Sequence, residues 1–421
     1  MADKRKTFLE GVQSHIKSSE ARDFVACELN DHIDSAKERI MKSGKTELEA
    51  EEEAVKQMGN PAKLGMDFNN IHRPKVDWWL AGLLLITVSF SLLPMFTWNV
   101  DGSPWLMKKV ITIFLGLFVA FGLMMLDYRK IFRYQWLFLG LGVLILLWLI
   151  LWPVQYINGA PSVYVGPLSI ESIMALPFLY LGWSILFSRE GFKMWKAAIL
   201  FIGTAFLFLM SVNLSVVFIY SIMVFVMMWG SRMELKKKTA VSASAFLVAA
   251  VYGFLFVTAT QEYQQARLLA YLNPARFADS GGYMYLRLKE TFSQAGWFGQ
   301  FGKQEFIPAG HTDFVFASIT YQFGWITGLI LFIVLLSLMG RMVIVISKVK
   351  DPFGKMLILG SVTLFSVQFL YNVGMLLGLL PLTGISLPFI SYGLMPTLLN
   401  SIVVGIVLSV YRRKDLIGEV V

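Results

Sequence analysis

The chain has 421 residues, of which 56% are hydrophobic and only 15% are charged, and its mean hydropathy is +0.61. Soluble proteins have a charged share nearer a quarter, so this composition excludes a soluble globular protein and indicates a polytopic membrane protein. The net charge of +9 is not a sign of nucleic-acid binding, because the basic residues lie mostly at the ends of apolar segments, where they determine topology. No nucleic acid is expected among the partners.

The first 77 residues are hydrophilic, unlike the rest. They hold 13 basic and 15 acidic residues, and their apolar positions recur at helical spacing. Turn signals at residues 43–46 and 59–61 each end one helix and begin the next. This spacing predicts a small helical domain. Because a signal-peptide apolar core is missing, we expect residues 1–77 to stay in the cytoplasm. Cys27, the one cysteine of the chain, excludes an intrachain disulfide and is expected to be buried.

Ten apolar segments follow, each near the length of about 20 residues that spans a hydrocarbon core. They are approximately 78–98, 108–126, 132–152, 172–188, 195–211, 213–230, 239–259, 313–338, 355–379 and 396–411. Basic residues follow every second segment, whereas connections such as 153–171 lack Lys and Arg, which predicts that both termini are cytoplasmic. The fold class is therefore all-α, with about ten transmembrane helices in residues 78–421 and a small N-terminal helical domain.

One connection on the predicted outer side, about 260–312, is far longer than a typical loop and is expected to be functional. Met284, Leu288 and Phe292 recur in it at helical spacing and predict a helix lying in the membrane interface. The chain has no HExxH motif and no Cys/His cluster, so no metal site is predicted.

The stretch from Pro381 to Gly393, PLTGISLPFISYG, interrupts an apolar region with prolines, glycines and serines. Irregular backbone survives at membrane depth only where protein surrounds it or a polar cavity adjoins it, so this stretch predicts a site. Acidic residues near membrane depth are candidates for chemistry there. After those that suit solvated surfaces or turns are set aside, Glu171, Asp279 and Asp313 remain on the predicted outer side.

Three stretches carry a family resemblance. They are Asn372 and Gly374 followed by PLTGISLPFISYG, the sequence FIPAGHTDFVFA at 306–317 and, more weakly, NGA at 158–160. With ten predicted spans and the long connection, residues 78 to about 415 resemble the FtsW/RodA/SpoVE family of bacterial cell-wall membrane proteins, the SEDS family. Residues 1–77 resemble the HAAS-type or permease-prefix domain, which implies either a regulatory, partner-docking role or a solvated appendage.

The resemblance implies a peptidoglycan glycosyltransferase of cell division, cell shape or sporulation. It would polymerise lipid II at the outer face of the bacterial cytoplasmic membrane, together with a class B penicillin-binding protein, a transpeptidase. An acidic side chain would act as general base on the acceptor hydroxyl. A cation or a divalent metal would stabilise the leaving diphosphate, and the candidate contacts are Arg267, Arg276 and Lys303. The substrate-groove candidates are Glu171, His311, Asp313, Ser391 and Tyr392.

The chain also departs from the family. An Asp shortly after an Asn-Pro pair in the outer loop is regarded as the family's catalytic residue, but alignment on Asn273 and Pro274 places Phe277 there. Asp279 lies two residues later and is the candidate base, provided the loop shifts locally. Polar residues usual in the family are also altered, at 162–163, at 212–215 and at 168–171 with Met174. Residues 394–396 read Leu-Met-Pro, where small residues are usual in the family.

These departures leave two other hypotheses open. One is a catalytically weakened relative that binds a lipid-linked precursor or acts as a regulatory scaffold. The other is a transporter of the lipid-linked precursor, although the paired intramembrane charges expected for ion coupling are missing from the sequence. A cytosolic protein that binds residues 1–77 is a further possible partner.

Overall fold

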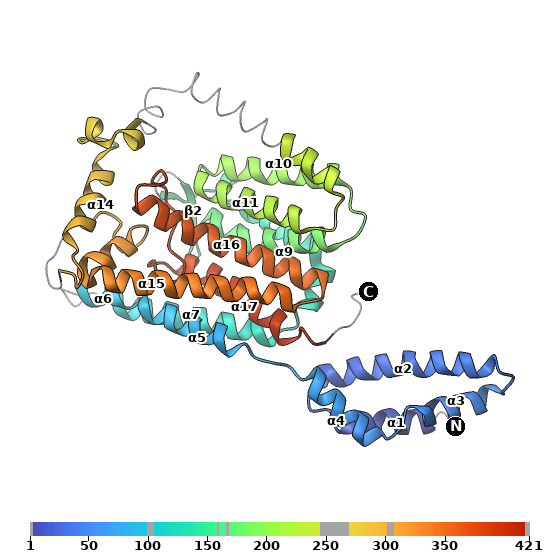
Figure 1. Ribbon diagram of the computed structural model, residues 1–421. Coiled ribbons are helices and arrows are strands. Elements are labelled where there is room, and N and C mark those ends of the chain that lie inside the picture. The colour runs from blue at the N-terminus through green and yellow to red at the C-terminus, as the bar shows by residue number, and fades with distance from the viewer. Residues whose placement is uncertain are drawn as a thin grey trace. The chain divides into compact units, whose positions relative to one another are not determined.

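Figure 1 shows the computed structural model, which describes residues 3–98, 105–157, 160–165, 168–244, 269–300 and 307–416. The chain divides into two compact units. The first unit comprises Met1–Asp77, Val349–Asp351 and Tyr411–Val421, and the second comprises Trp78–Lys348 and Pro352–Val410.

The first unit contains four helices, α1 (Asp3–Ser14), α2 (Ser19–Met41), α3 (Glu47–Gln57) and α4 (Pro61–His72). Both predicted turns are confirmed, because Met41 ends α2 before the first turn and Gln57 ends α3 before the second. Each helix after a turn begins with a side-chain cap. Thr46 and Glu49 form a capping box on α3, and Asn60 caps α4 just before the proline at its first position.

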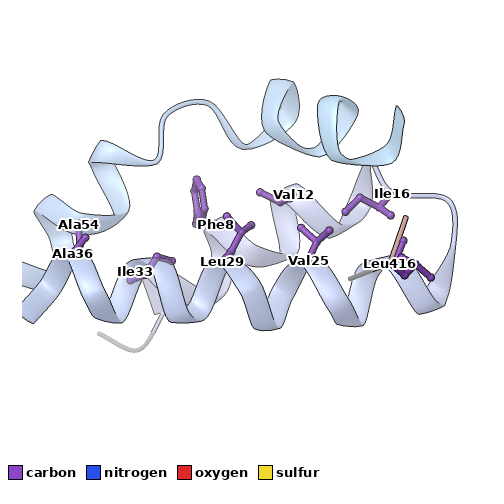
Figure 2. Packing of buried hydrophobic residues seen from close by; sticks show 10 residues of the cluster. Phe8, Val12, Ile16, Val25, Leu29, Ile33, Ala36, Ala54 and Leu416 are labelled. Atoms are coloured by element: carbon purple, nitrogen blue, oxygen red, sulfur yellow. The ribbon is translucent and has the colours of Figure 1, made fainter. Parts of the chain in front are cut away.

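The core of this unit is built from apolar positions one turn apart on the long helix α2. Val25, Leu29 and Ile33 point from α2 toward Phe8 and Val12 of α1, as Figure 2 shows. Cys27 lies on the opposite, solvated side of α2 and is exposed. The expectation of a buried thiol was therefore wrong. The buried face of α2 includes Val25 and Leu29, and position 27, midway between them in the sequence, faces away from it.

The C-terminal end of the chain is part of this first unit. Arg413 is fully buried, and its Nε and Nη2 atoms each donate to the Glu20 carboxylate at 2.8 Å. His72 Nδ1 donates to the Asp415 carbonyl at 2.8 Å, and Lys75 Nζ lies 2.8 Å from the Asp415 carboxylate. Leu416 joins the hydrophobic cluster of α1 and α2. Residues 413–416 thus form a docked tail held by buried charge, hydrogen bonds and apolar contact.

Replacing Glu20 with Gln is expected to release the docked tail. A buried guanidinium that loses a charged partner costs about 3–5 kcal/mol, and the Glu20 side chain is 33% exposed, so we expect about 3 kcal/mol. Hydrogen exchange of residues 411–416 measures the effect. Glu52→Gln is the control, because Lys4 and Glu52 are 68% and 58% exposed and such pairs contribute about 0–1 kcal/mol. Equal exchange in both variants would contradict the role of the buried pair.

The second unit follows the predicted order of apolar segments. Its helices are α5 (Trp78–Phe90), α6 (Leu93–Trp98), α7 (Trp105–Met125), α8 (Gln135–Leu151), α9 (Ala175–Ser188), α10 (Met194–Met210), α11 (Leu214–Gly230), α14 (Tyr283–Gln294), α15 (Val315–Lys348), α16 (Pro352–Leu376) and α17 (Leu394–Arg412), with short 3-10 helices η1 (Tyr128–Tyr134), η2 (Ser172–Met174) and η3 (Pro274–Phe277). Residues 235–244 are helical too, and most of the expected span 239–259 lies outside the described residues. Six of the described helices are long and apolar enough to cross a membrane.

Helix α16 lies at the centre of this unit and packs against α9, α11 and α15, which flank it in Figure 1. Polar contacts between these helices are fully buried. Tyr180 of α9 donates to the Leu357 carbonyl of α16 at 2.6 Å, and Trp183 Nε1 donates to the Tyr220 hydroxyl of α11 at 2.8 Å. Membrane helices gain from such hydrogen bonds, because lipid offers no alternative partner.

Two features of the second unit were not predicted. The first is a three-stranded antiparallel sheet in the connection after α8, formed by β1 (Gln155–Ile157), β2 (Ala160–Val165) and β3 (Leu168–Ile170) in that order. The second is a break in α15 at Gly324, whose φ of 87° is outside the helical range. The expected helix in the long connection is confirmed as α14, which packs on α15, and its location in the membrane interface stays a prediction.

The break in α15 receives the backbone that follows α14. Trp325 N donates to the Gly296 carbonyl at 3.0 Å, and Gln300 N donates to the Tyr321 carbonyl at 2.9 Å. A Cβ at position 324 would collide with the Trp297 carbonyl. Glycine at 324 is therefore required both by its positive φ and by this close approach.

Gly324→Ala is expected to displace residues 296–300 from α15 and to destabilise the unit by about 2 kcal/mol or more, since a strained φ alone costs about 1–3 kcal/mol. Thermal unfolding in detergent and proteolysis of the long connection measure the effect. Gly340→Ala in the same helix is the control, because a Cβ there meets nothing within 4 Å. A similar melting temperature for both variants would contradict the close approach.

Candidate functional site

The candidate site is built around the irregular segment between α16 and α17. The chain has no helix or strand from residue 377 to 393, and its turns use left-handed backbone at Gly378 (φ 74°) and Phe389 (φ 62°). A left-handed phenylalanine is strained and persists only where its surroundings hold it. Phe389 is buried at 3% exposure, so the fold holds this turn in place.

Lys109 of α7 satisfies the carbonyl groups that this turn exposes. Its Nζ donates to the carbonyl oxygens of Phe389 at 3.0 Å, Ile390 at 3.2 Å and Ser391 at 2.9 Å, and its side chain is fully buried. An ammonium group has three donors, so these carbonyls use all of them. Turn backbone that would otherwise lack partners in apolar surroundings is thereby satisfied.

Asn372 of α16 joins the irregular segment to the stretch before α15. Its Nδ2 donates to the Asp313 carbonyl at 2.8 Å and to the Ile385 carbonyl at 2.6 Å. Because both carbonyls are bonded by one fully buried amide, residues 313 and 385 keep a fixed separation.

Ser391 forms a second connection between the same two stretches. Its hydroxyl accepts from Leu387 N at 2.8 Å and donates to the Thr312 carbonyl at 2.7 Å, and Tyr392 N donates to the His311 carbonyl at 2.8 Å. The structure therefore brings His311, Asp313, Ser391 and Tyr392 together. Ser391 is 1% exposed and its hydroxyl is already used, so it positions this site rather than contacting a ligand.

An aromatic group lies at this junction. Trp105, the first residue of α7, packs its ring 5.4 Å from His311 and 5.0 Å from Tyr392, centroid to centroid. Burial lowers the pKa of His311, which favours the neutral imidazole, and burial raises the pKa of the Tyr392 phenol.

Asp313 is the carboxylate of this junction. It precedes α15 and is half-buried, and Ser386 Oγ donates to its Oδ1 at 3.4 Å. Burial raises the pKa of Asp313 to about 6, while the hydrogen bond from Ser386 acts in the opposite direction. Glu171, at the end of β3, is also half-buried. Burial raises its pKa, and a hydrogen bond from Ser169 opposes the shift.

The other predicted site residues lie elsewhere. Asp279 is exposed in the turn after η3 and bonds to no described residue, and Arg276 in η3 is exposed as well. Arg267 and Lys303 lie outside the described residues. Within the described part of the chain, no three His, Cys, Asp or Glu side chains form a group that could hold a metal ion.

Two tyrosines fasten the long connection to the irregular segment. Tyr271 donates to the Leu379 carbonyl at 2.8 Å, and the Tyr285 hydroxyl accepts from Leu382 N at 2.9 Å. The part of the connection that carries Asp279 is therefore held beside the start of the segment, although the Asp279 side chain itself faces solvent.

Sequence reasoning missed Lys109 and Trp105. A signal for Lys109 was present, because the pair Lys108-Lys109 stands at the predicted outer end of a span, against the positive-inside rule. Trp105 carried no such signal, since tryptophan is common at any membrane interface.

Fold and site together define a multi-pass membrane protein with an irregular, internally hydrogen-bonded segment at one end of its helices. The model of the FtsW/RodA/SpoVE cell cycle proteins matches residues 75–416, so the chain belongs to this family of bacterial membrane proteins.

Curated relatives agree over part of the chain. The probable peptidoglycan glycosyltransferase FtsW of Geobacter metallireducens is 37% identical over 163 residues, which are 38% of this chain and 44% of that protein. Stage V sporulation protein E of Bacillus subtilis is 30% identical over 165 residues, 38% and 45% of the two chains. The matched part thus spans less than half the length of these relatives.

Solved structures show the same fold. A chain from a peptidoglycan synthase complex, described as coordinating polymerization and crosslinking, aligns with a TM-score of 0.69 and 22% identity over 80% of this chain and 98% of that one. The rod shape determining protein RodA of Thermus thermophilus aligns with a TM-score of 0.61 and 21% identity over 80% and 97%.

Lys109→Met is expected to loosen the irregular segment. Three buried carbonyls lose their donor, and each unsatisfied polar group costs about 1–3 kcal/mol, so even with partial relaxation the loss should be about 3 kcal/mol. Thermal unfolding in detergent measures it. Lys108→Met is the matched control, because the neighbouring side chain is exposed. A loss of the same size for Lys108→Met would show that the carbonyl contacts are not the cause.

Proposed function

We propose that this chain is a peptidoglycan glycosyltransferase that polymerises lipid II at the outer face of the cytoplasmic membrane, with both termini in the cytoplasm. One observation carries the proposal. Buried hydrogen bonds from Lys109, Asn372 and Ser391 hold two stretches of the family pattern, 307–317 and 381–393, as one junction that presents a desolvated carboxylate. The names of the curated relatives support the activity.

The proposed reaction needs a base and a stabilised leaving group. A carboxylate takes the proton of the acceptor hydroxyl as its oxygen attacks the anomeric carbon, and the diphosphate leaves with the electrons of the broken bond. Lys109 is not available to that diphosphate, because carbonyls occupy its three donors. The proposed contacts are therefore the cations of the long connection, Arg267, Arg276 and Lys303, with a divalent metal as a further possibility.

A class B penicillin-binding protein is the proposed partner. The support is the structural match to a chain from a synthase complex that joins polymerization to crosslinking. For residues 1–77 we propose a cytosolic regulatory partner, supported by the compact helical domain with its own core.

The test is polymer formation from labelled lipid II. The full chain, purified in detergent, is incubated with lipid II alone and with class B transpeptidases, and products are resolved by gel electrophoresis. We expect glycan polymer that is absent without protein. Lipid II binding without polymer under every partner condition would instead support a precursor-binding relative. Movement of labelled lipid II across vesicles, again without polymer, would support a transporter.

A further inference from the structure

The described residues of the second unit offer four carboxylates on the predicted outer side: Glu171, Asp279, Glu290 and Asp313. Glu290 lies on the exposed face of α14, where Arg287 and Gln294 each donate to it at 3.1 Å. Asp279 is exposed and has no partner among the described residues. Neither side chain is withdrawn from bulk water.

Glu171 is half-buried, and its side chain accepts from Ser169, a neighbour two residues away along the chain. Asp313 differs because side chains of other elements hold it. The Asn372 amide bonds the carbonyl of Asp313, and the Ser391 hydroxyl bonds that of Thr312, so two consecutive peptide groups are fixed by buried side chains. Ser386 donates to Oδ1 of the carboxylate. Oδ2 lies 3.7 Å from where a Cβ of Gly384 would stand, so a side chain at position 384 would contact this oxygen, and glycine leaves that space beside it free of side-chain atoms of its own.

A base on an acceptor hydroxyl must be placed within hydrogen-bond reach of it and kept there. We infer that Asp313, rather than Asp279, is the general base for glycosyl transfer in this chain, with Oδ2 receiving the proton. This inference rests on the proposed glycosyltransferase function and names the catalytic residue of that same site.

The step is balanced. The acceptor O–H bond breaks and its proton passes to Asp313 Oδ2, while the acceptor oxygen forms a bond to the anomeric carbon. The bond from that carbon to the diphosphate oxygen breaks, and the electron pair leaves with the diphosphate. Water then takes the proton from Asp313 and restores the carboxylate.

The electrostatic surroundings suit this role. A base works best when its pKa lies near the working pH, and burial has raised the pKa of Asp313 to about 6. The titratable groups at the junction are His311 on the same stretch, Tyr392 on the irregular segment and Lys109, which is reached through Ser391. Burial lowers the pKa of His311, so the imidazole stays neutral near pH 7. Asn372, on α16, carries no charge.

The first experiment compares lipid II polymerisation by Asp313→Asn, Asp279→Asn and the control Glu290→Gln in the full chain. Loss of a general base costs about 10²- to 10⁴-fold, so Asp313→Asn should lower the initial rate at least about a hundredfold while lipid II binding is kept. Glu290→Gln should keep the wild-type rate. Asp279→Asn tests the competing assignment, and loss of polymer there with Asp313→Asn still active would overturn ours.

A second variant guards against misfolding of Asp313→Asn. Ser386→Ala removes the hydrogen bond that stabilises the charged carboxylate, so the pKa of Asp313 should rise further. The wild-type rate should fall as pH drops through about 6, and in Ser386→Ala this fall should begin at higher pH. Thr383→Val is the matched control, because its hydroxyl contacts Met375 Sδ at 3.8 Å and not Asp313.

The outcomes separate the two claims. Wild-type protein that forms no polymer with any partner overturns the proposed function and this inference with it. The assignment of Asp313 is overturned, and the function stands, if the wild type forms polymer but the pH at which its rate falls is the same in folded Ser386→Ala. A shift of this pH by the same amount in Thr383→Val would also overturn the assignment.

Discussion

A turn inside a membrane protein exposes carbonyl groups that lipid cannot satisfy, and here three of them converge on the Lys109 ammonium. The contact joins the start of α7 to the irregular segment between α16 and α17. Around it the amide of Asn372 and the hydroxyl of Ser391 add the bonds that fix the stretch before α15. The geometry of the site is therefore set mainly by side chains that hydrogen-bond backbone carbonyl groups, and the reactive side chains are placed by that backbone.

Much of this architecture follows from local patterns in the sequence. Apolar length placed the membrane helices, and Thr46, Asn60 and Pro61 marked helix starts, because caps and proline act within one turn. The break at Gly324 and the burial of Lys109 could not be predicted in this way. Each depends on a partner far along the chain, Gly296–Trp297 for the first and residues 389–391 for the second.

The carboxylates show the same limit. Sequence alignment drew attention to Asp279 because it stands near Phe277, where the family has its acidic residue, whereas Asp313 was only one of three acidic residues left on the predicted outer side. Burial distinguishes them, and burial is a property of the folded chain. The scaffold of the site is kept although Phe277 replaces the family's acidic residue. Catalysis can be retained in such a site if another carboxylate, here Asp313, is already oriented by the same scaffold.

The docked tail makes the first unit discontinuous in the chain. Glu20 and His72 emerge early in synthesis, whereas Arg413, Asp415 and Leu416 are added only after all the membrane segments have been made. The amino-terminal helices therefore gain their full set of charge and core contacts only once residues 413–416 have been made. Any product truncated before residue 413 would retain an unfinished first unit, which gives quality-control proteases a means of recognising incomplete chains.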